Sequence, residues 1–203
     1  MIQEIEIEKL KNHSANVRKS YENLEELTES IRTQGILQNL TVVPDPSDPG
    51  TYLVVIGNCR LVAARRAGLK TLPCAVRKMT DRQQAEVMLM ENMQRNDLTL
   101  REQAQGFQMV LDLGGTVDDI AEKTGFSKST VYHRLNIAKL DQEELKKREE
   151  SDGFQLSIKD MIALEKVKSI EDRNDILKRA NSPADLQWRI ENKLQEEKDR
   201  EWT

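Results

Sequence analysis

The chain has 203 residues, of which 37% are hydrophobic, 4% are aromatic and 33% are charged, and its formal net charge is −4. This composition fits two small, highly charged domains better than one large core, and no run of about 18 apolar residues is present, which excludes a membrane-spanning helix. The two cysteines form no CxxC pair and no secretory signal is visible, so we expect a cytoplasmic protein without a zinc site.

The first part of the chain shows strand and helix patterns in turn. "EIEI", residues 4–7, alternates Glu with Ile as a half-buried strand does. "ENLEELTESIRTQG", residues 22–35, places apolar residues at helical spacing and ends at Gly35, which suits a helix C-cap. Three short apolar or β-branched runs predict further strands: residues 39–44, 52–56 and 72–76. These patterns predict a small mixed α/β domain.

From Asp81 onwards the pattern becomes helical. "DRQQAEVMLMENMQR" predicts a helix for which Asp81 is a good N-cap, and the later segments also have helical patterns separated by glycine- and serine-containing turns. We therefore expect an α+β protein, in which residues 1–95 form the mixed α/β N-terminal domain and residues 96–203 form an all-α domain.

"TVDDIAEKTGFSKSTVYHRLN" has the spacing of a helix-turn-helix, which we place at residues 116–137. Ala121 is small where two helices cross, and Gly125 suits a turn with positive φ. The cap and the exposed early positions of the second helix are polar or cationic: Ser127, Lys128, Ser129, Thr130, Tyr132, His133 and Arg134. Such groups suit phosphates and base edges in a major groove. The alternative is an ordinary helical hairpin; several constraints met together favour DNA binding.

A second candidate site lies in "VVIGNCRLVAARRAGLKTLPCAVRK", which contains no acidic residue although the whole chain is acidic. Gly57 stands between a predicted strand and a predicted helix, where main-chain amides and the helix N-terminus favour an anion such as phosphate. Arg60 would add a charged, forked donor. The alternative, an ordinary strand-to-helix junction with a basic solvent-exposed face, is equally compatible with these residues alone.

A third candidate site lies in "ENMQRNDL". Glu91 and Asn92 are adjacent oxygen donors, and oxygen ligands on a helix suit Mg²⁺ that is shared with phosphates. Arg95 follows Glu91 by one helical turn, so the alternative is an ion pair between these two side chains near a helix end. Taken by themselves, the residues favour the alternative.

Several segments of the chain, and the order in which they occur, resemble the ParB family of chromosome and plasmid partition proteins. "NVRKSYENLEELTESIRTQGILQNLTVVP", "YLVVIGNCRLVAARRAGLKTLPCAVR" and "ENMQRNDLTLREQA" resemble its N-terminal domain, and the helix-turn-helix with "LSIKDMIAL" resembles its central domain. The resemblance implies that the chain binds CTP with Mg²⁺ and recognises a palindromic, centromere-like DNA site. It also implies a homodimer that closes into a sliding clamp with nucleotide and DNA, acts as a slow CTPase, works with a partition ATPase and associates with nucleoid or plasmid.

The resemblance assigns roles to individual residues. The family's Gly-Glu-Arg-Arg phosphate motif falls on Gly57, Asn58, Cys59 and Arg60; its Glu-Asn-x-x-Arg motif falls on Glu91 (metal and hydrolysis), Asn92 (metal) and Arg95 (nucleotide); its base-proximal loop includes Gly35 and Gln38. Asn58 and Cys59 depart from this pattern, because they replace a glutamate and an arginine. A missing charged hydrogen bond predicts a nucleotide affinity about tenfold lower or more.

Two other functions remain open on the sequence. A plain helix-turn-helix transcriptional regulator with a degenerate nucleotide site is favoured by Asn58 and Cys59. A sulfiredoxin-like or kinase-like enzyme is suggested by Cys59, although those enzymes lack a DNA-binding half. The family also has a separate C-terminal dimerisation domain, whereas this sequence stops at the charged segment "KLQEEKDREWT". We therefore expect either a fragment or a short family member. We also expect dimerisation only with nucleotide and DNA.

Overall fold

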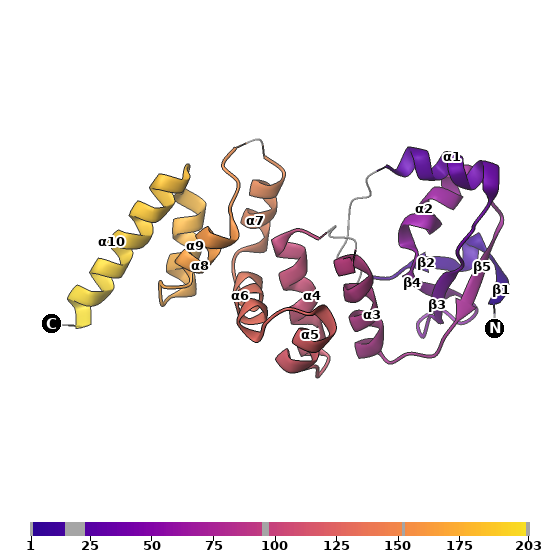
Figure 1. The fold of residues 1–203 in the computed structure, drawn as a ribbon, viewed down its shortest axis with the longest axis horizontal. Coiled ribbons are helices and arrows are strands. Elements are labelled where there is room, and N and C mark those ends of the chain that lie inside the picture. Colours follow the sequence, from indigo (N-terminus) through magenta and orange to yellow (C-terminus); the bar gives the residue numbers. More distant parts are fainter. Residues whose placement is uncertain (1, 15–22, 95–97, 152, 202–203) are drawn as a thin grey trace. The chain divides into compact units, whose positions relative to one another are not determined.

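The computed structural model describes residues 2–14, 23–94, 98–151 and 153–201 (Figure 1). The chain forms two compact units. Unit 1 comprises residues 1–97 and 112–115, and unit 2 comprises residues 98–111 and 116–203.

Unit 1 is built on a mixed five-stranded sheet of order β1-β5-β3-β4-β2. Its elements are β1 (Ile2–Glu6), the 3₁₀ turn η1 (Ile7–Lys9), β2 (Leu10–Asn12), α1 (Leu24–Gln34), β3 (Leu40–Pro44), β4 (Tyr52–Ile56), α2 (Asn58–Ala67), β5 (Thr71–Val76) and α3 (Asp81–Gln94). Strand β3 runs antiparallel to β4 and parallel to β5, while β1 runs antiparallel to β5 and β2 runs parallel to β4. The first strand begins before the predicted residues 4–7, and η1 ends the extended segment at Ile7.

Both faces of this sheet are buried. Successive side chains on a strand point to opposite sides, so neighbouring residues of β3 and β4 show what covers each face. Val42 and Val54 belong to the core that the sheet forms with α1 and α2. Their neighbours Val43 and Val55 instead pack with Met88 of α3. Helices therefore cover the two faces, α1 with α2 on one side and α3 on the other (Figure 1).

All the regular secondary structure in the described residues of unit 2 is helical. Its elements are α4 (Leu100–Asp112), α5 (Val117–Thr124), α6 (Lys128–Ala138), α7 (Gln142–Glu149), α8 (Ile158–Leu164), α9 (Ile170–Arg179) and α10 (Pro183–Glu201). Several helices begin at a capping side chain that accepts a main-chain N–H: Thr116, Ser127, Asp141, Ser157 and Ser169. Such caps satisfy amides that have no partner within the helix. Leu164, Leu177 and Leu186 are fully buried in the core that these helices share.

The predicted α+β class is therefore confirmed. One local prediction was wrong: Asp81 is the first residue of α3 rather than its cap. Thr80 caps the helix, because its hydroxyl accepts the Gln83 N–H at 3.3 Å while its own N–H donates to the Gln83 side chain. Within the described residues, every helix is too short or too polar to span a bilayer.

Candidate functional site

The junction between β4 and α2 requires glycine. Gly57 has φ +101°, a left-handed conformation that side chains with a Cβ rarely adopt. A Cβ at this position would lie 3.1 Å from Leu40 Cγ and 3.2 Å from Arg60 Nη2. Gly57 therefore lets the start of β3 and the Arg60 side chain approach the main chain at the N-terminus of α2.

Arg60 connects this junction to the loop that precedes β3. Its Nη1 donates to the main-chain carbonyls of Gln38 and, at 3.0 Å, of Asn39. That loop begins at Gly35, which ends α1 with φ +72°. The structure thus brings Gly57 and Arg60 together with the loop of residues 35–40. Arg60 is the side chain predicted to bind phosphate, and its Nη1 already donates to carbonyls of this loop.

Asn58 is turned into the protein. It is 8% exposed, and its Nδ2 donates to the carbonyl of Val54 at 3.1 Å. Its Oδ1 is buried and accepts no hydrogen bond from the described residues. Asn58 thus stands where the ParB motif has a glutamate. Its buried amide is bonded to β4 and contributes no charge at the junction.

The two cysteines differ in their surroundings. Cys59 is half-buried near the start of α2. Cys74 is fully buried in β5, and burial, with a smaller contribution from the charge of Glu4, raises its pKa to about 11. Neither forms a disulfide in the described structure.

Glu91 and Asn92 lie near the end of α3, and the third member of their motif, Arg95, lies outside the described residues. Glu91 is half-buried, whereas Asn92 is 4% exposed and its Nδ2 donates to the carbonyl of Met88 at 2.9 Å. The described residues contain no group of three or more His, Cys, Asp or Glu placed to hold a metal ion. Glu91 and Asn92 thus offer one or two protein oxygens, the number that a Mg²⁺ ion shared with phosphates and water commonly takes.

The basic window of the sequence does not form a single surface. Arg65 is exposed but donates to the carbonyl of Leu10 in β2. Lys70 precedes β5 and Arg77 follows it, so about 20 Å of extended strand separates them. The predicted anion site is therefore confined to the surroundings of Gly57 and Arg60.

In unit 2 the helix-turn-helix is formed by α5 and α6. Gly125 ends α5 with φ +75°, and Ser127 caps α6 by accepting the Thr130 N–H at 3.1 Å. Ile120 and Val131 are buried at the contact between the two helices. These residues hold α6 in a fixed position with respect to α5.

The predicted DNA-contacting residues divide into an exposed group and a group held within unit 2. Lys128, Ser129 and Tyr132 are exposed, and Tyr132 keeps 57% of its surface accessible. Lys128 Nζ lies 2.6 Å from Asp118 Oδ1, and this hydrogen bond raises the pKa of the lysine. Thr130 is half-buried, and its hydroxyl lies 2.9 Å from that of Ser127.

The last two predicted residues of α6 have partners on other helices. Arg134 Nε donates to Gln103 Oε1 of α4 at 2.9 Å, and its guanidinium lies 5.9 Å from the centre of the Phe126 ring. Burial lowers the pKa of Arg134. His133 Nδ1 lies 2.9 Å from Glu165 Oε2. Arg134 thus packs within unit 2, while His133 lies at the edge of the exposed face.

Comparisons with known proteins identify the family to which this chain is similar. Residues 1–93 match the family described as the ParB N-terminal domain. The chain is 41% identical over 124 residues to the chromosome-partitioning protein Spo0J of Thermus thermophilus, an alignment that covers 61% of this chain and 45% of that protein. It is 37% identical over 143 residues to the chromosome-partitioning protein ParB of Caulobacter vibrioides, with coverages of 69% and 47%. The chain belongs to the ParB family.

A solved structure extends the ParB likeness to both units. The C-terminally truncated chromosome-partitioning protein ParB from Caulobacter crescentus, complexed to the centromeric parS site, is similar with a TM-score of 0.57 and 28% identity. The alignment covers 88% of this chain and all of that chain. The family predicted from the motifs is therefore confirmed. The chain spans about half the length of the curated ParB relatives it matches.

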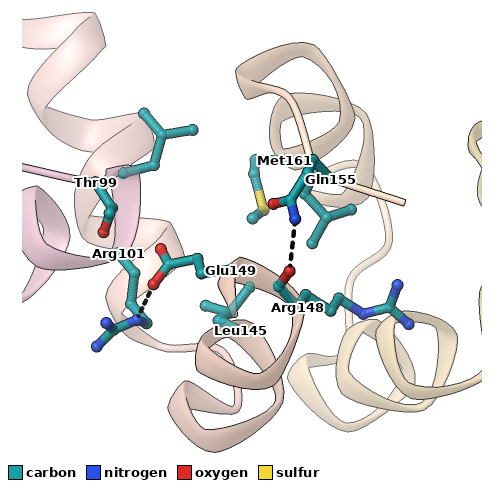
Figure 2. Close-up of a pocket in the computed structure, with 9 residues that line it drawn as sticks. Thr99, Arg101, Leu145, Arg148, Glu149, Gln155 and Met161 are labelled. Atoms are coloured by element: carbon teal, nitrogen blue, oxygen red, sulfur yellow. Dashed lines mark hydrogen bonds and ion pairs between the residues drawn. The ribbon is translucent and has the colours of Figure 1, made fainter. Parts of the chain in front are cut away.

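A pocket of about 250 Å³ lies within unit 2 of this ParB-family chain, and none of the predicted DNA-contacting residues lines it (Figure 2). Arg101 Nε donates to Glu149 Oε2 at 2.7 Å across its mouth, and Gln155 Nε2 donates to the carbonyl of Arg148 at 2.9 Å. Leu145, Leu156 and Met161 add apolar lining. These polar groups form hydrogen bonds with one another, so we interpret the pocket as part of the helical core of unit 2.

Sequence reasoning missed the partners that hold the α6 side chains. Gln103 and Glu165 lie 31 and 32 residues from Arg134 and His133, and neither belongs to the helix-turn-helix motif. Asp118 was nearer, ten residues before Lys128, yet the acidic first turn of α5 was treated as separate from α6. Only the tertiary fold places these groups side by side.

Proposed function

We propose that this ParB-family chain is a sequence-specific DNA-binding protein of chromosome or plasmid partition, in which residues 96–203 bind DNA and residues 1–95 bind CTP. The observation that carries the proposal is the exposed face of α6, where Lys128, Ser129 and Tyr132 project from a capped helix that is anchored on α5. The truncated ParB complexed to parS supports DNA as the ligand, because its alignment spans both units. A palindromic DNA site would be met by a homodimer.

The nucleotide would occupy the junction at Gly57. Main-chain amides at the start of α2 would bind its phosphates, Arg60 would supply the charged fork, and the loop containing Gly35 and Gln38 would lie near the base. Glu91 and Asn92 would approach Mg²⁺, with Glu91 and the bound metal serving slow hydrolysis, and Arg95 would complete the set. Nucleotide and DNA together would favour the closed homodimer that acts with a partition ATPase.

A plain helix-turn-helix regulator is the second candidate, and one observation favours it. The Asn58 amide bonds to Val54 and carries no charge, so Arg60 is the charged side chain that the described phosphate motif retains. Under this second function, the protein would not bind CTP, either alone or in the presence of DNA.

Lys128→Ala tests the DNA interface. Removing one phosphate contact should lower the affinity and reduce the slope of log affinity against log salt by about 0.9 per contact, because fewer counterions are released. Fluorescence anisotropy with a duplex selected from a randomised library measures both quantities. Lys178→Ala, at an exposed position of α9, is the matched control and should leave both unchanged. An unaltered salt slope in Lys128→Ala would remove the N-terminal turn of α6 from the interface.

Thiol labelling tests the nucleotide site. Iodoacetamide should modify Cys59 much faster than Cys74, because Cys74 is fully buried and its pKa is about 11. Millimolar CTP with Mg²⁺ should slow the labelling of Cys59, since bound phosphates would cover the start of α2. Cys74 is the internal control, and mass spectrometry of the labelled peptides gives both rates. Equal Cys59 rates with and without CTP, in the presence of DNA, would favour the plain regulator.

A further inference from the structure

His133 and Glu165 form a pair that joins the exposed face of α6 to the end of α8. His133 Nδ1 lies 2.9 Å from Glu165 Oε2, and the two side chains are 31% and 17% exposed. Glu165 is the residue at which α8 ends. The pair therefore lies partly sheltered from solvent beside the predicted DNA-contacting face.

The chemistry of the pair determines which ring nitrogen is protonated. An ionised carboxylate has no proton to donate, so the hydrogen bond requires the proton on His133 Nδ1. Glu165 Oε1 is buried and accepts no hydrogen bond from the described residues, which leaves the His133 ring as the side-chain partner of this carboxylate in the described structure. In the neutral ring, Nε2 is then a hydrogen-bond acceptor.

The position of Nε2 connects the pair to the exposed face of α6. It lies 3.4 Å from the hydroxyl of Ser129, one helical turn earlier, and Ser129 is exposed. Residues four apart on a helix share a face. The acceptor nitrogen thus points along the side of α6 that a major groove would meet.

The main chain that carries this carboxylate is held by the Arg173 side chain. Arg173 of α9 donates from Nη2 to the carbonyl of Glu165 at 2.7 Å and from Nε to that of Val167 at 2.6 Å. Leu164, immediately before Glu165, is fully buried. A fixed main chain at Glu165 fixes the direction from which its carboxylate reaches His133.

We infer that His133 is a specificity-determining residue for DNA and that Glu165 is its positioning residue. Glu165 holds the ring in the tautomer with an outward-facing acceptor, and Nε2 accepts a hydrogen bond from the exocyclic amino group of adenine or cytosine in the major groove. The pair selects the base-pair orientation that places such an amino group, rather than a carbonyl oxygen, opposite Nε2. This inference rests on the proposed DNA-binding function.

The test compares base preference among variants of the full chain. Wild type, His133→Ala, Glu165→Leu, Glu165→Ala and Glu165→Gln are each used to select sites from a duplex library with a randomised core. His133→Ala should lose about tenfold discrimination at one base pair of the half-site. Glu165→Leu and Glu165→Ala should lose preference at the same base pair, whereas Glu165→Gln should retain more of it because its carbonyl still accepts the Nδ1 proton.

Two controls separate positioning from folding. Melting temperatures show whether Glu165→Leu and Glu165→Ala, the two variants without a hydrogen-bond acceptor, are folded. Because the two new side chains differ in size, the test remains valid if one of the two variants fails to fold. The other base pairs of the selected site are the internal reference within each variant, and Glu143→Ala, which removes an exposed carboxylate on α7, should keep the wild-type preference throughout.

The outcomes distinguish the inference from the function on which it rests. If folded variants of both residues keep the wild-type base preference, the inference is overturned and the DNA-binding function stands. If wild type itself selects no sequence from the library, both are overturned. Loss of preference at one shared base pair in folded variants of both residues, with the preference at the other base pairs kept, supports the pair as proposed.

Discussion

Arg60→Ala is expected to weaken CTP binding by about tenfold to a hundredfold, measured by titration calorimetry with Mg²⁺ and DNA present. A hydrogen bond to a charged group contributes about 1.5–3 kcal/mol, and Arg60 has to supply that contribution without a neighbouring arginine, because position 59 is a cysteine. The arginine also bonds to the carbonyls of Gln38 and Asn39, so its removal frees the loop before β3. Both effects reduce nucleotide affinity.

Arg66→Ala is the matched control, since Arg66 is an exposed arginine on the same helix. It should leave CTP affinity unchanged. Arg60→Lys should be almost as weak as Arg60→Ala, because an ammonium group lacks the planar fork that spans two acceptors. If wild type gives no heat with CTP, ATP or GTP even beside its DNA site, the plain regulator replaces the nucleotide-gated function.

Local sequence patterns were sufficient for the helix-turn-helix. Gly125, Ser127 and the buried Ile120 and Val131 act within one short segment, so spacing alone indicates their roles. The same reasoning treated Arg134 as a DNA ligand. That role stays a prediction, and the structure adds that the side chain meets Gln103 from α4 and the Phe126 ring. These contacts depend on tertiary packing and are not visible in the motif.

The nucleotide site shows a similar limit. The glycine at a strand-to-helix junction was readable in the sequence, and Gly57 has the positive φ that such a junction requires. The sequence did not indicate the direction of the Asn58 side chain, because its amide could have faced a ligand as easily as the Val54 carbonyl. The lack of acidic residues in this window did not show how its basic residues are arranged, and the intervening strand β5 separates Lys70 from Arg77.

Phe107→Ala is expected to destabilise unit 2 by about 3–5 kcal/mol, the usual cost of removing a buried phenylalanine side chain. Phe107 is fully buried in α4, and its ring lies 6.3 Å from that of Phe126 at an angle of 60°. Phe126 stands in the turn between α5 and α6, beneath the guanidinium of Arg134. The cavity would therefore remove support from the turn that orients α6, and specific DNA affinity should fall together with stability.

Guanidinium denaturation followed by circular dichroism measures the free energy of unfolding, and anisotropy at a temperature where the variant remains folded measures DNA affinity. Trp188→Ala is the control: it also deletes a large aromatic ring from unit 2, but Trp188 is 59% exposed, so its cost should stay within about 0.5 kcal/mol. Phe107→Leu should recover much of the stability, because it refills most of the cavity. A Phe107→Ala protein that unfolds like wild type would show that α4 does not support the turn. A destabilised protein with unchanged DNA affinity would show that the turn keeps its geometry without the aromatic contact.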